Sequence, residues 1–516
     1  MERIEKTKNH SVKKNYIYNV IYQVFALIVP LITAPFIARV LSAEGVGQYS
    51  FTNSLQSYFT LFAAFGFGYY AQREIANERD DKFKQSKTFW ELIIIRSLPV
   101  SIAVGLNCVF CFSGIYGGYT ELMWWWTFLI GATEFDISFL FQGNEEFGKI
   151  VIRNVLVKII SVACIFVFVK TKYDVWIYVL LTSISTLIGN LSLWSYLPKY
   201  VSFVKLSELR PLKHFVPAMK LFIPTIATSL YTMFDKTLIG VLITDTYTIQ
   251  EQQIVDGIET TVNVVKKYSD LENGYYEQSE KIVKICMTVI TALGTVMIPR
   301  NTKLYSDGKL DELKKNFYFA TNFVWTLGIP MMFGLAAISP NLIPWFLGSG
   351  YDKCILLMQL FTPLVILIGM SNVFGIQYLI PTKRDKKFTI GILAGCFSNL
   401  ILDLILIPFF WSYGAVIASL IAEFLVTFTM WIQIRKEISI LSIIKQSITP
   451  LISGLIMFIV VYLSQMFLKQ TWYFTFLLII EGIFVYFVLM VLFKNQFLMM
   501  FIKKISIKFK RINKRK

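Results

Sequence analysis

Long apolar blocks separated by short polar segments run through almost the whole chain, and this pattern decides what the chain can fold into. About 20 apolar residues in an α-helix cross the hydrocarbon core of a bilayer. Blocks of that length recur near 16–41, 48–72, 88–113, 119–142, 150–170, 174–197, 218–243, 280–299, 317–338, 354–380, 388–408, 412–434, 447–467 and 471–493. The sequence therefore predicts an all-α polytopic membrane protein of about fourteen transmembrane helices.

The composition excludes a set of soluble domains. Hydrophobic residues make up 55% of the 516 and charged residues 16%, whereas soluble domains carry roughly 25% charged residues. The net charge of +17 would suggest nucleic acid as a partner of a soluble protein. Here the basic residues lie between apolar blocks, where they set topology and meet anionic lipid headgroups. Membrane lipids are therefore expected partners, and nucleic acid is not.

The basic residues also predict the orientation. With the N-terminus inside, alternate connections on the inner side carry 36 Lys and Arg, and those on the outer side carry 7 when Lys170 and Lys281, at the outer ends of their spans, are included. Such a bias follows the positive-inside rule, so both termini are expected in the cytoplasm. The stretch from Tyr16 to Leu41 is too long for a cleaved signal and is interpreted as the first helix. A multi-pass location in a membrane is therefore expected.

A faint repeat suggests the domain organisation. Gly47-Gln-Tyr49 opens one predicted helix and Gly274-Tyr-Tyr276 opens another, and each follows a helix that contains proline. Two six-helix lobes are expected, since transporters often place their site between such repeats. The predicted parts are an N-terminal lobe at 1–197, a C-terminal lobe at 198–446, two further transmembrane helices at 447–493 and a basic cytoplasmic tail at 494–516.

Motifs from about residue 10 to 435 carry a resemblance to a known family. They include Asn15-Tyr-Ile-Tyr-Asn-Val-Ile-Tyr-Gln23, Pro30-Leu-Ile-Thr-Ala-Pro35-Phe-Ile-Ala-Arg39, Arg73-Glu-Ile-Ala76, Asp136-Ile-Ser138, Gln142-Gly-Asn-Glu-Glu-Phe147, Arg153-Asn-Val-Leu-Val-Lys158, Asp235-Lys-Thr-Leu-Ile-Gly240, Leu293-Gly-Thr-Val-Met-Ile-Pro-Arg300 and Tyr378-Leu-Ile-Pro-Thr382. In this order they resemble bacterial polysaccharide flippases of the multidrug/oligosaccharidyl-lipid/polysaccharide exporter superfamily.

The resemblance implies a V-shaped exporter fold, alternating access and an undecaprenyl-diphosphate-linked oligosaccharide as substrate. It implies capsule, exopolysaccharide or O-antigen synthesis as the pathway, with its polymerase and glycosyltransferases as possible partners. The chain departs from the family at two places. The acidic segment 244–273 looks like an insertion, and Phe139 stands where the family pattern has tryptophan.

Seven cations fall inside predicted helices, where a charge is expensive and normally faces a cavity or a partner. A diphosphate headgroup would bind guanidinium and ammonium groups by charge-assisted hydrogen bonds. These cations are the candidate substrate-binding residues, with snorkelling as the alternative for the three near helix ends, Arg39, Arg153 and Lys220. The others are Arg96, Lys158, Lys236 and Lys284.

Embedded carboxylates are either ion-coupling sites or structural partners of these cations. The candidates for ion coupling are Asp136, Asp235, Asp403 and Glu423. Cys108 and Cys111 have CxxC spacing but form one apolar stripe, and both histidines fall in polar segments. No catalytic residue, metal site or cofactor is predicted, and the chain is not expected to be an enzyme.

Two other functions remain open at this stage. A multidrug or organic-cation exporter of the same superfamily would be expected to have an acidic, aromatic cavity. A membrane polysaccharide polymerase or glycosyltransferase would require a catalytic residue in a substantial outer loop. The longest outer connection is the acidic segment near 244–279, and the embedded cations outnumber the embedded carboxylates. Both features favour the flippase.

Overall fold

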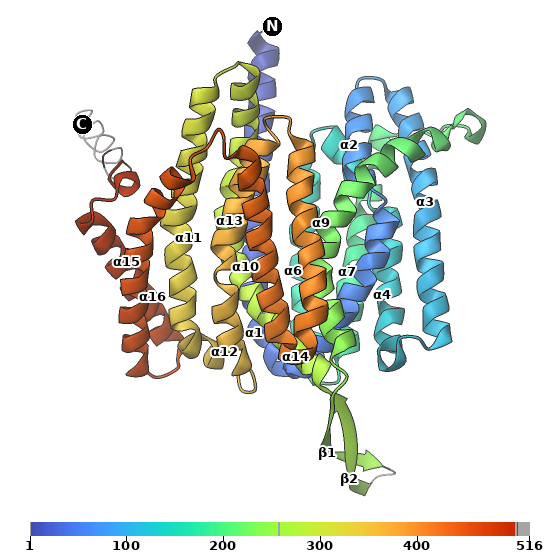
Figure 1. The fold of residues 1–516 in the computed structure, drawn as a ribbon. Helices are drawn as coiled ribbons and strands as arrows, with labels where there is room; N and C mark the ends of the chain where they lie inside the picture. The colour runs from blue at the N-terminus through green and yellow to red at the C-terminus, as the bar shows by residue number, and fades with distance from the viewer. Residues whose placement is uncertain (1, 256–257, 501–502, 504–516) are drawn as a thin grey trace, which may run out of the picture. The chain divides into compact units, whose positions relative to one another are not determined.

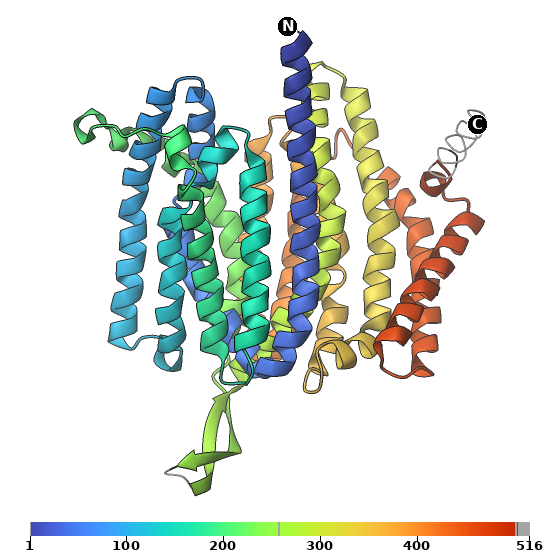
Figure 2. The same cartoon turned by 180° about the vertical axis from the view of Figure 1, so that it is seen from behind.

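The computed structural model describes residues 2–255, 258–500 and 503, and most of these residues lie in long α-helices (Figures 1 and 2). The chain divides into two compact units, Met1–Gly274 and Tyr275–Lys516. We call them unit 1 and unit 2 and describe each by itself. The fold class predicted from the sequence, an all-α polytopic membrane protein, is confirmed.

Unit 1 holds nine helices, several short 3₁₀ turns, a β-hairpin and the start of a tenth helix in the described part of the chain. In order these are α1 (Glu2–Ala64), α2 (Phe67–Glu78), α3 (Lys82–Ser113), η1 (Gly117–Tyr119), α4 (Thr120–Ala132), η2 (Thr133–Phe135), α5 (Ser138–Gly143), α6 (Phe147–Phe168), α7 (Val175–Trp194), α8 (Leu197–Tyr200), η3 (Leu206–Glu208), η4 (Pro211–His214), α9 (Phe215–Leu242), β1 (Thr246–Val255), β2 (Ile258–Lys267) and the first turns of α10 (Tyr268–Ser306).

Unit 2 continues α10 and adds helices up to residue 492. These are α11 (Leu310–Phe346), α12 (Lys353–Phe361), α13 (Leu364–Phe374), the π-helical turn η5 (Gly375–Leu379), α14 (Asp385–Ile434), α15 (Ile440–Met466) and α16 (Trp472–Leu492). Helix α11 is central, because it packs against α13, α15 and α16. The two helices predicted at 447–493 are α15 and α16, and hydrogen bonds tie them to α11. Tyr486 Oη donates to the Thr326 carbonyl at 3.0 Å, and Trp345 Nε1 donates to Thr475 Oγ1 at 2.6 Å.

Two of the long helices are each a pair of spans joined at a sharp kink. Ser42 in α1 has φ 61° and ψ 174°, and Trp411 in α14 has φ 54° and ψ −131°. A non-glycine residue with positive φ is uncommon, and each kink lies a few residues after a proline, Pro35 and Pro408. The kinks fall between predicted spans, so the sequence placed these boundaries correctly.

Eleven helical segments of the described residues are long and apolar enough to cross a membrane. One of them, Ile28–Glu78, covers the first two predicted spans. The predicted span 119–142 is broken into α4, η2 and α5, and the predicted span 218–243 corresponds to α9. Every one of the fourteen predicted spans therefore coincides mostly with helix, although the second (48–72), the fourth (119–142) and the tenth (354–380) are not continuous.

The two compact units are divided at Gly274, and the predicted lobe boundary at residue 197 stays a prediction. Helix α9 packs against α1 and α2 and belongs to unit 1. A side-chain network contributes to this packing. Thr237 Oγ1 on α9 lies 2.9 Å from both Ser54 Oγ and Tyr58 Oη on α1. The predicted basic tail at 494–516 lies mostly outside the described residues.

The β-hairpin is the segment that the sequence marked as an insertion. Its antiparallel strands pair from Thr246 with Lys267 to Val255 with Ile258, and the hairpin projects away from the helices of unit 1 (Figures 1 and 2). An isolated two-stranded hairpin is marginally stable. This one is anchored at its base, where Lys266 forms an ion pair with Glu44 and Tyr247 packs against Tyr268 with ring centroids 4.8 Å apart.

The two GxY motifs of the sequence repeat meet in space. A Cβ atom at Gly47 would lie 1.6 Å from the carbonyl oxygen of Asp270, and one at Gly274 would lie 1.9 Å from the carbonyl oxygen of Ala43. The contacts are reciprocal, because each glycine faces the carbonyl group of the residue four positions before the other glycine. Helix α1 and the first turns of α10 thus cross backbone to backbone, which only glycine permits at both positions.

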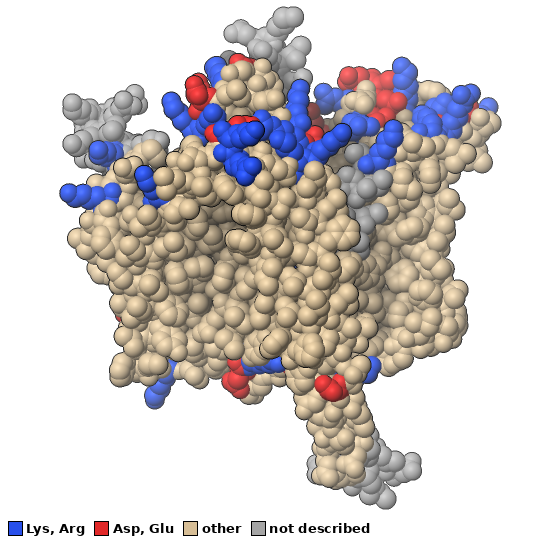
Figure 3. Space-filling view, viewed as in Figure 1, with Lys and Arg blue, Asp and Glu red and all other residues tan. Residues whose placement is uncertain are grey.

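In unit 2 the alternation of helices places the basic connections at one end. The turns before α11, α14 and α15 lie at the same end, and Figure 3 shows blue side chains gathered along that end of the unit. The basic residues in or next to these turns include Lys309, Lys314, Lys383, Arg384, Lys387 and Lys436. The opposite turns carry Lys353 and Lys469. The segregation of charge is as predicted, and the assignment of the basic end to the cytoplasm stays a prediction.

Candidate functional site

A cavity of about 350 Å³ lies inside unit 1 between α1, α6 and α7. We call it the cationic cavity, because two of the predicted substrate-binding residues, Arg153 and Lys158, line it. The other lining residues are Phe25, Val29, Pro30, Thr33, Tyr49, Asn154, Val157, Ser161, Val162, Ile165, Tyr178, Thr182, Ser185, Thr186 and Gly189. The cavity therefore combines two cations with a series of hydroxyl groups.

The helical period explains how the sequence builds this lining. Asn154, Lys158, Ser161 and Ile165 recur three or four positions apart on α6 and so share one face. On α7 the residues Tyr178, Thr182, Ser185, Thr186 and Gly189 do the same. The hydroxyls of Thr182 and Thr186 donate to the backbone carbonyls of Tyr178 and Thr182 at 2.8 and 2.9 Å. Their oxygen lone pairs can still accept a hydrogen bond.

Arg153 is held in place by side chains from α5 and α7. Its Nη1 donates to Asn190 Oδ1 at 2.8 Å and its Nη2 donates to Ser138 Oγ at 3.0 Å. Asn190 in turn donates to the Ala132 carbonyl at 2.8 Å. Gly189 allows α6 and α7 to approach closely, since a Cβ there would lie 3.2 Å from Val157 Cγ2. The guanidinium is thus oriented before any ligand arrives, which lowers the entropic cost of binding.

The charge of this lining is one-sided. Of the residues that line the cationic cavity, two are basic and none is Asp or Glu. Both cations lie on α6, a helix with the length and hydropathy of a membrane span. A cation in such surroundings attracts an anion more strongly than it would in water. This arrangement suits an anionic ligand.

Arg96, the third predicted cation of unit 1, is placed differently. Its side chain is buried, with a relative exposure of 5%. It donates to the carbonyl of Asp136 at 2.7 Å and to the carbonyl of Glu134, and its guanidinium lies 5.6 Å from the centroid of the Phe139 ring. Arg96 therefore joins α3 to the break between α4 and α5, where backbone carbonyls lose their helical partners. Substrate contact by Arg96 stays a prediction.

The remaining predicted cations lie elsewhere. Arg39 on α1 and Lys220 at the start of α9 are exposed, and Lys236 on α9 is half-buried next to the buried Asp235. Lys284 of unit 2 is exposed and forms an ion pair with Glu280 at 2.8 Å. Arg153 and Lys158 are the pair of predicted cations that one described cavity brings together.

The predicted ion-coupling carboxylates divide between the two units. In unit 1, Asp136 Oδ1 accepts from the Ser138 backbone N–H at 2.9 Å. In unit 2, Asp403 and Glu423 are buried on α14, and Glu423 Oε2 accepts from Ser371 Oγ at 3.5 Å. Among the described residues no group of three His, Cys, Asp or Glu side chains is arranged to hold a metal ion. Ion coupling by these carboxylates stays a prediction.

Sequence reasoning about charge alone missed the polar lining of α7. Tyr178, Thr182 and Thr186 recur every fourth position in α7. That polar stripe is a readable signal, because polar residues within a span face the protein interior or a cavity. Asn190 and Ser138, which hold Arg153, carried no comparable signal, since their proximity depends on how α5 and α7 pack.

Comparisons with known proteins agree with this architecture. Residues 12–305 match a family model described as polysaccharide biosynthesis protein, and residues 258–356 match a second model with the same description. A protein of Escherichia coli (strain K12) whose name associates it with O-antigen transport is 24% identical over 84% of this chain and 98% of its own length. A Shigella dysenteriae protein of the same name is 22% identical over 78% of this chain and 94% of its own length.

Solved structures show the same fold. The lipid II flippase MurJ in an inward closed conformation aligns over 94% of this chain and 100% of its own, with a TM-score of 0.70 and 17% identity. A multidrug resistance MATE family transporter of the MOP superfamily in its inward-facing conformation aligns over 80% of this chain and 98% of its own, with a TM-score of 0.56 and 12% identity. The protein is therefore a multi-pass membrane protein with the fold of these exporters, and it belongs to the polysaccharide biosynthesis protein family.

Proposed function

We propose that this protein is a flippase that moves a lipid-linked oligosaccharide, joined to undecaprenol by a diphosphate, from the inner to the outer leaflet of the bacterial cytoplasmic membrane. The oligosaccharide is the repeat unit of a capsule, exopolysaccharide or O-antigen. Transport proceeds by alternating access without a covalent step, and the pathway's polymerase and glycosyltransferases are the partners. Both termini lie in the cytoplasm, as the basic connections favour.

The observation that carries the proposal is the cationic cavity with no carboxylate in its lining. A diphosphate is compact, doubly charged and rich in acceptor oxygens. Arg153 offers an oriented guanidinium, and Lys158 adds a second positive charge one helical turn further along α6. Charge-assisted hydrogen bonds of this kind are worth roughly 1.5–3 kcal/mol each. The named relatives in O-antigen transport give independent support for the class of substrate.

The alternative within the superfamily is export of organic cations or drugs. That function is disfavoured by the same observation, because a cationic substrate would require carboxylates where this cavity has Arg153 and Lys158. The shared fold does not decide between the two functions. A polymerase or glycosyltransferase is disfavoured because the large outer segment is a narrow hairpin.

The test is the leaflet in which the lipid-linked repeat unit resides when the gene is deleted from its own cells. We expect the repeat unit to accumulate in the inner leaflet and to reach the outer leaflet again when the wild-type gene is restored. Arg153→Ala should restore transport about tenfold to a hundredfold less well at equal protein level, as expected for loss of a charge-assisted contact. Lys445→Ala, which removes an exposed cation of α15 that is outside the candidate binding residues, is the control and should restore transport fully.

Normal outer-leaflet repeat unit in the deleted strain would reject the flippase. Efflux of ethidium by the purified protein in vesicles, combined with no movement of the lipid-linked repeat unit, would establish the drug-exporter alternative.

A further inference from the structure

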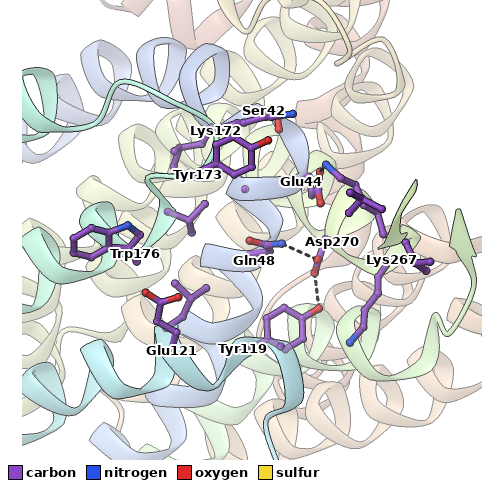
Figure 4. Close-up of a pocket in the computed structure, with 18 residues that line it drawn as sticks. Ser42, Glu44, Gln48, Tyr119, Glu121, Lys172, Tyr173, Trp176, Lys267 and Asp270 are labelled. Carbon is purple, nitrogen blue, oxygen red and sulfur yellow. Dashed lines mark hydrogen bonds and ion pairs between the residues drawn. The ribbon is translucent and has the colours of Figure 1, made fainter. Parts of the chain in front are cut away.

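A second cavity, of about 440 Å³, lies in unit 1 at the base of the β-hairpin. Its walls are the kink of α1, the turn that leads into α4, the loop before α7, and the residues that join β2 to α10 (Figure 4). We call it the hairpin-base pocket. It lies at the kink of α1, at the end of unit 1 from which the β-hairpin projects (Figure 1), which is the outer end in the proposed orientation. Its size is within the ordinary range for small-ligand sites, roughly 300–1,000 Å³.

The floor of the hairpin-base pocket is a rigid polar group. Asp270, with a relative exposure of 5%, accepts a hydrogen bond from Tyr119 Oη at 2.6 Å and one from Gln48 Nε2 at 3.2 Å. The backbone crossing at Gly47 fixes the position of Asp270 against α1. A carboxylate held by two donors retains lone pairs that can accept further hydrogen bonds.

Aromatic rings and one carboxylate form the opposite side. Trp176 and Glu121 stand across from Gln48 and Asp270, and Tyr173 lies above them (Figure 4). Glu121 makes no hydrogen bond or ion pair with any residue that the structure describes, and its side chain is exposed. Trp176 is half-buried and is supported from behind by Trp125, with ring centroids 5.7 Å apart.

The charges of the hairpin-base pocket balance. Its lining contains the acids Glu44, Glu121 and Asp270 and the bases Lys172, Lys266 and Lys267. Glu44 and Lys266 neutralise each other in an ion pair, and Lys267 Nζ lies 4.7 Å from the centroid of the Tyr119 ring. Such a lining gives no net attraction to a diphosphate. It offers a dense set of donors and acceptors next to flat rings.

We infer that the hairpin-base pocket binds the saccharide part of the transported molecule, as one to a few neutral sugar residues. Sugar rings present hydroxyls around their edge and C–H groups on their faces, which match carboxylate, amide and ammonium groups beside an aromatic surface. The inference rests on the proposed function for the identity of the ligand. It assigns the diphosphate and the sugar to different places in unit 1, namely the cationic cavity and the hairpin-base pocket.

The test uses the full-length protein in nanodiscs and the oligosaccharide released by mild acid from the lipid-linked repeat unit of the cells that carry the protein. Saturation-transfer difference NMR should detect binding of this oligosaccharide without lipid or phosphate. Trp176→Ala should weaken binding roughly threefold to tenfold, the range expected for loss of one aromatic contact. Trp472→Ala, an exposed tryptophan of unit 2, is the matched control and should bind as the wild type does.

Arg153→Ala separates this inference from the proposed function. It should leave binding of the free oligosaccharide unchanged while it reduces transport. Absence of binding to the wild type, or equal binding to Trp176→Ala and wild type, would overturn the inference. Loss of binding in Arg153→Ala would overturn it too, because the sugar would then reside in the cationic cavity. Failure of the leaflet assay with retained, Trp176-dependent binding would reject the flippase and leave the saccharide site standing.

Discussion

The cationic cavity and the hairpin-base pocket share walls from α1 and α7, yet their linings differ in charge. The first has two cations and no carboxylate, and the second has three acids and three bases. A lining with one sign of charge in apolar surroundings selects a ligand of the opposite charge, because no internal partner neutralises it. A balanced lining selects by hydrogen bonding and shape.

The difference also shows that a count of embedded charges over the whole chain is a weak guide to function. Cations outnumber carboxylates in the predicted spans, but the excess is useful only where the fold concentrates it. The two α6 cations share a cavity, whereas Arg96 is used within the fold. The charges that line each cavity, and not the total over the chain, indicate what the cavity can bind.

The largest effect is expected at the glycine crossing that supports the hairpin-base pocket. Gly47→Ala or Gly274→Ala would place a methyl group less than 2 Å from a backbone carbonyl oxygen. Neither backbone can retreat without separating α1 from α10, so we expect a loss of more than about 3 kcal/mol and little folded protein. Fluorescence-detected size exclusion and thermal unfolding of the purified variants measure this.

Gly105→Ala is the control for that substitution, since nothing lies within 4 Å of a Cβ at Gly105 in α3. It should be neutral or more stable by up to about 1 kcal/mol, because alanine favours a helix over glycine. If Gly47→Ala behaved like Gly105→Ala, the close crossing and the rigid floor of the hairpin-base pocket would both be wrong.

The next effect separates the two kinds of embedded cation. Arg96→Ala leaves the partly buried carbonyls of Glu134 and Asp136 without their donor, and loss of a hydrogen bond to a charged group costs roughly 1.5–3 kcal/mol. We expect a lower unfolding temperature and a reduced amount of protein in the membrane. Lys158→Ala removes an exposed side chain of the cationic cavity, so protein level should be normal and transport about tenfold lower.

Quantitative immunoblots together with the leaflet assay distinguish these outcomes. A normal protein level with lost transport in Arg96→Ala would make Arg96 a substrate-binding residue, as the sequence first predicted. Normal transport in Lys158→Ala would remove that side chain from the proposed headgroup site.

A smaller effect is expected from the outer part of the β-hairpin. Ile249 and Val264 are a paired position near its base, so residues 250–263 can be replaced by Asn-Gly, which favours a tight hairpin turn. The ion pair of Lys266 with Glu44 and the hydrogen bonds of Asp270 are kept. We expect normal folding and a less than about twofold change in oligosaccharide binding and transport, since the lining starts at Val264.

A longer deletion, of residues 246–270, is the variant to compare with this replacement. It removes Asp270 together with the anchored base, and it should abolish oligosaccharide binding and lower stability. Equal behaviour of the two deletions would show that the hairpin base contributes nothing to the pocket. The sequence marked the whole of 244–273 as an insertion, whereas the structure makes its last residues part of the bundle.

Much of the fold could be predicted because membrane spans follow from local hydropathy. The kinks at Ser42 and Trp411 fall between predicted spans because proline and short polar breaks are visible in the sequence. The predicted span 119–142 was wrong as a continuous helix. Its break at η2 is stabilised by Arg96 from another helix, and such a distant partner has no local signature.

The candidate sites were predicted less completely for the same reason. Arg153 and Lys158 were found because a cation in a span is conspicuous. The hairpin-base pocket joins four segments far apart in the chain, and Asp270 meets Tyr119 only through the glycine crossing. The sequence showed the two GxY motifs, but their reciprocal contact depends on the tertiary structure.

The smallest effect is expected from a buried polar cluster at the end of unit 1 opposite to the hairpin-base pocket. A change in this cluster should alter the stability of the protein and leave both cavities unchanged. His214 Nδ1 accepts from Tyr70 Oη at 2.7 Å, and its Nε2 donates to Glu91 Oε2 at 3.1 Å, where Lys213 also binds at 2.6 Å. Burial lowers the pKa of His214 below its ordinary value of 6.5, and the hydrogen bond to Glu91 opposes this only in part.

The unfolded chain therefore binds a proton at His214 more readily than the folded chain does. The contribution of neutral His214 to the free energy of unfolding is thus complete above about pH 6.5 and is lost as the pH falls below that value. We expect the unfolding temperature of the wild type in detergent to fall between pH 7.5 and pH 5.5 by a few degrees more than that of His214→Gln. Glutamine can keep one donor and one acceptor in the cluster but does not titrate, so the difference between the two curves isolates His214 from the other titrating groups. Binding of the free oligosaccharide, corrected for the folded fraction, should be the same in both proteins at each pH. Parallel unfolding curves would mean that His214 is not held neutral by burial, and a selective loss of oligosaccharide binding in His214→Gln would show that the two ends of unit 1 are coupled, contrary to the separation of roles argued for its two cavities.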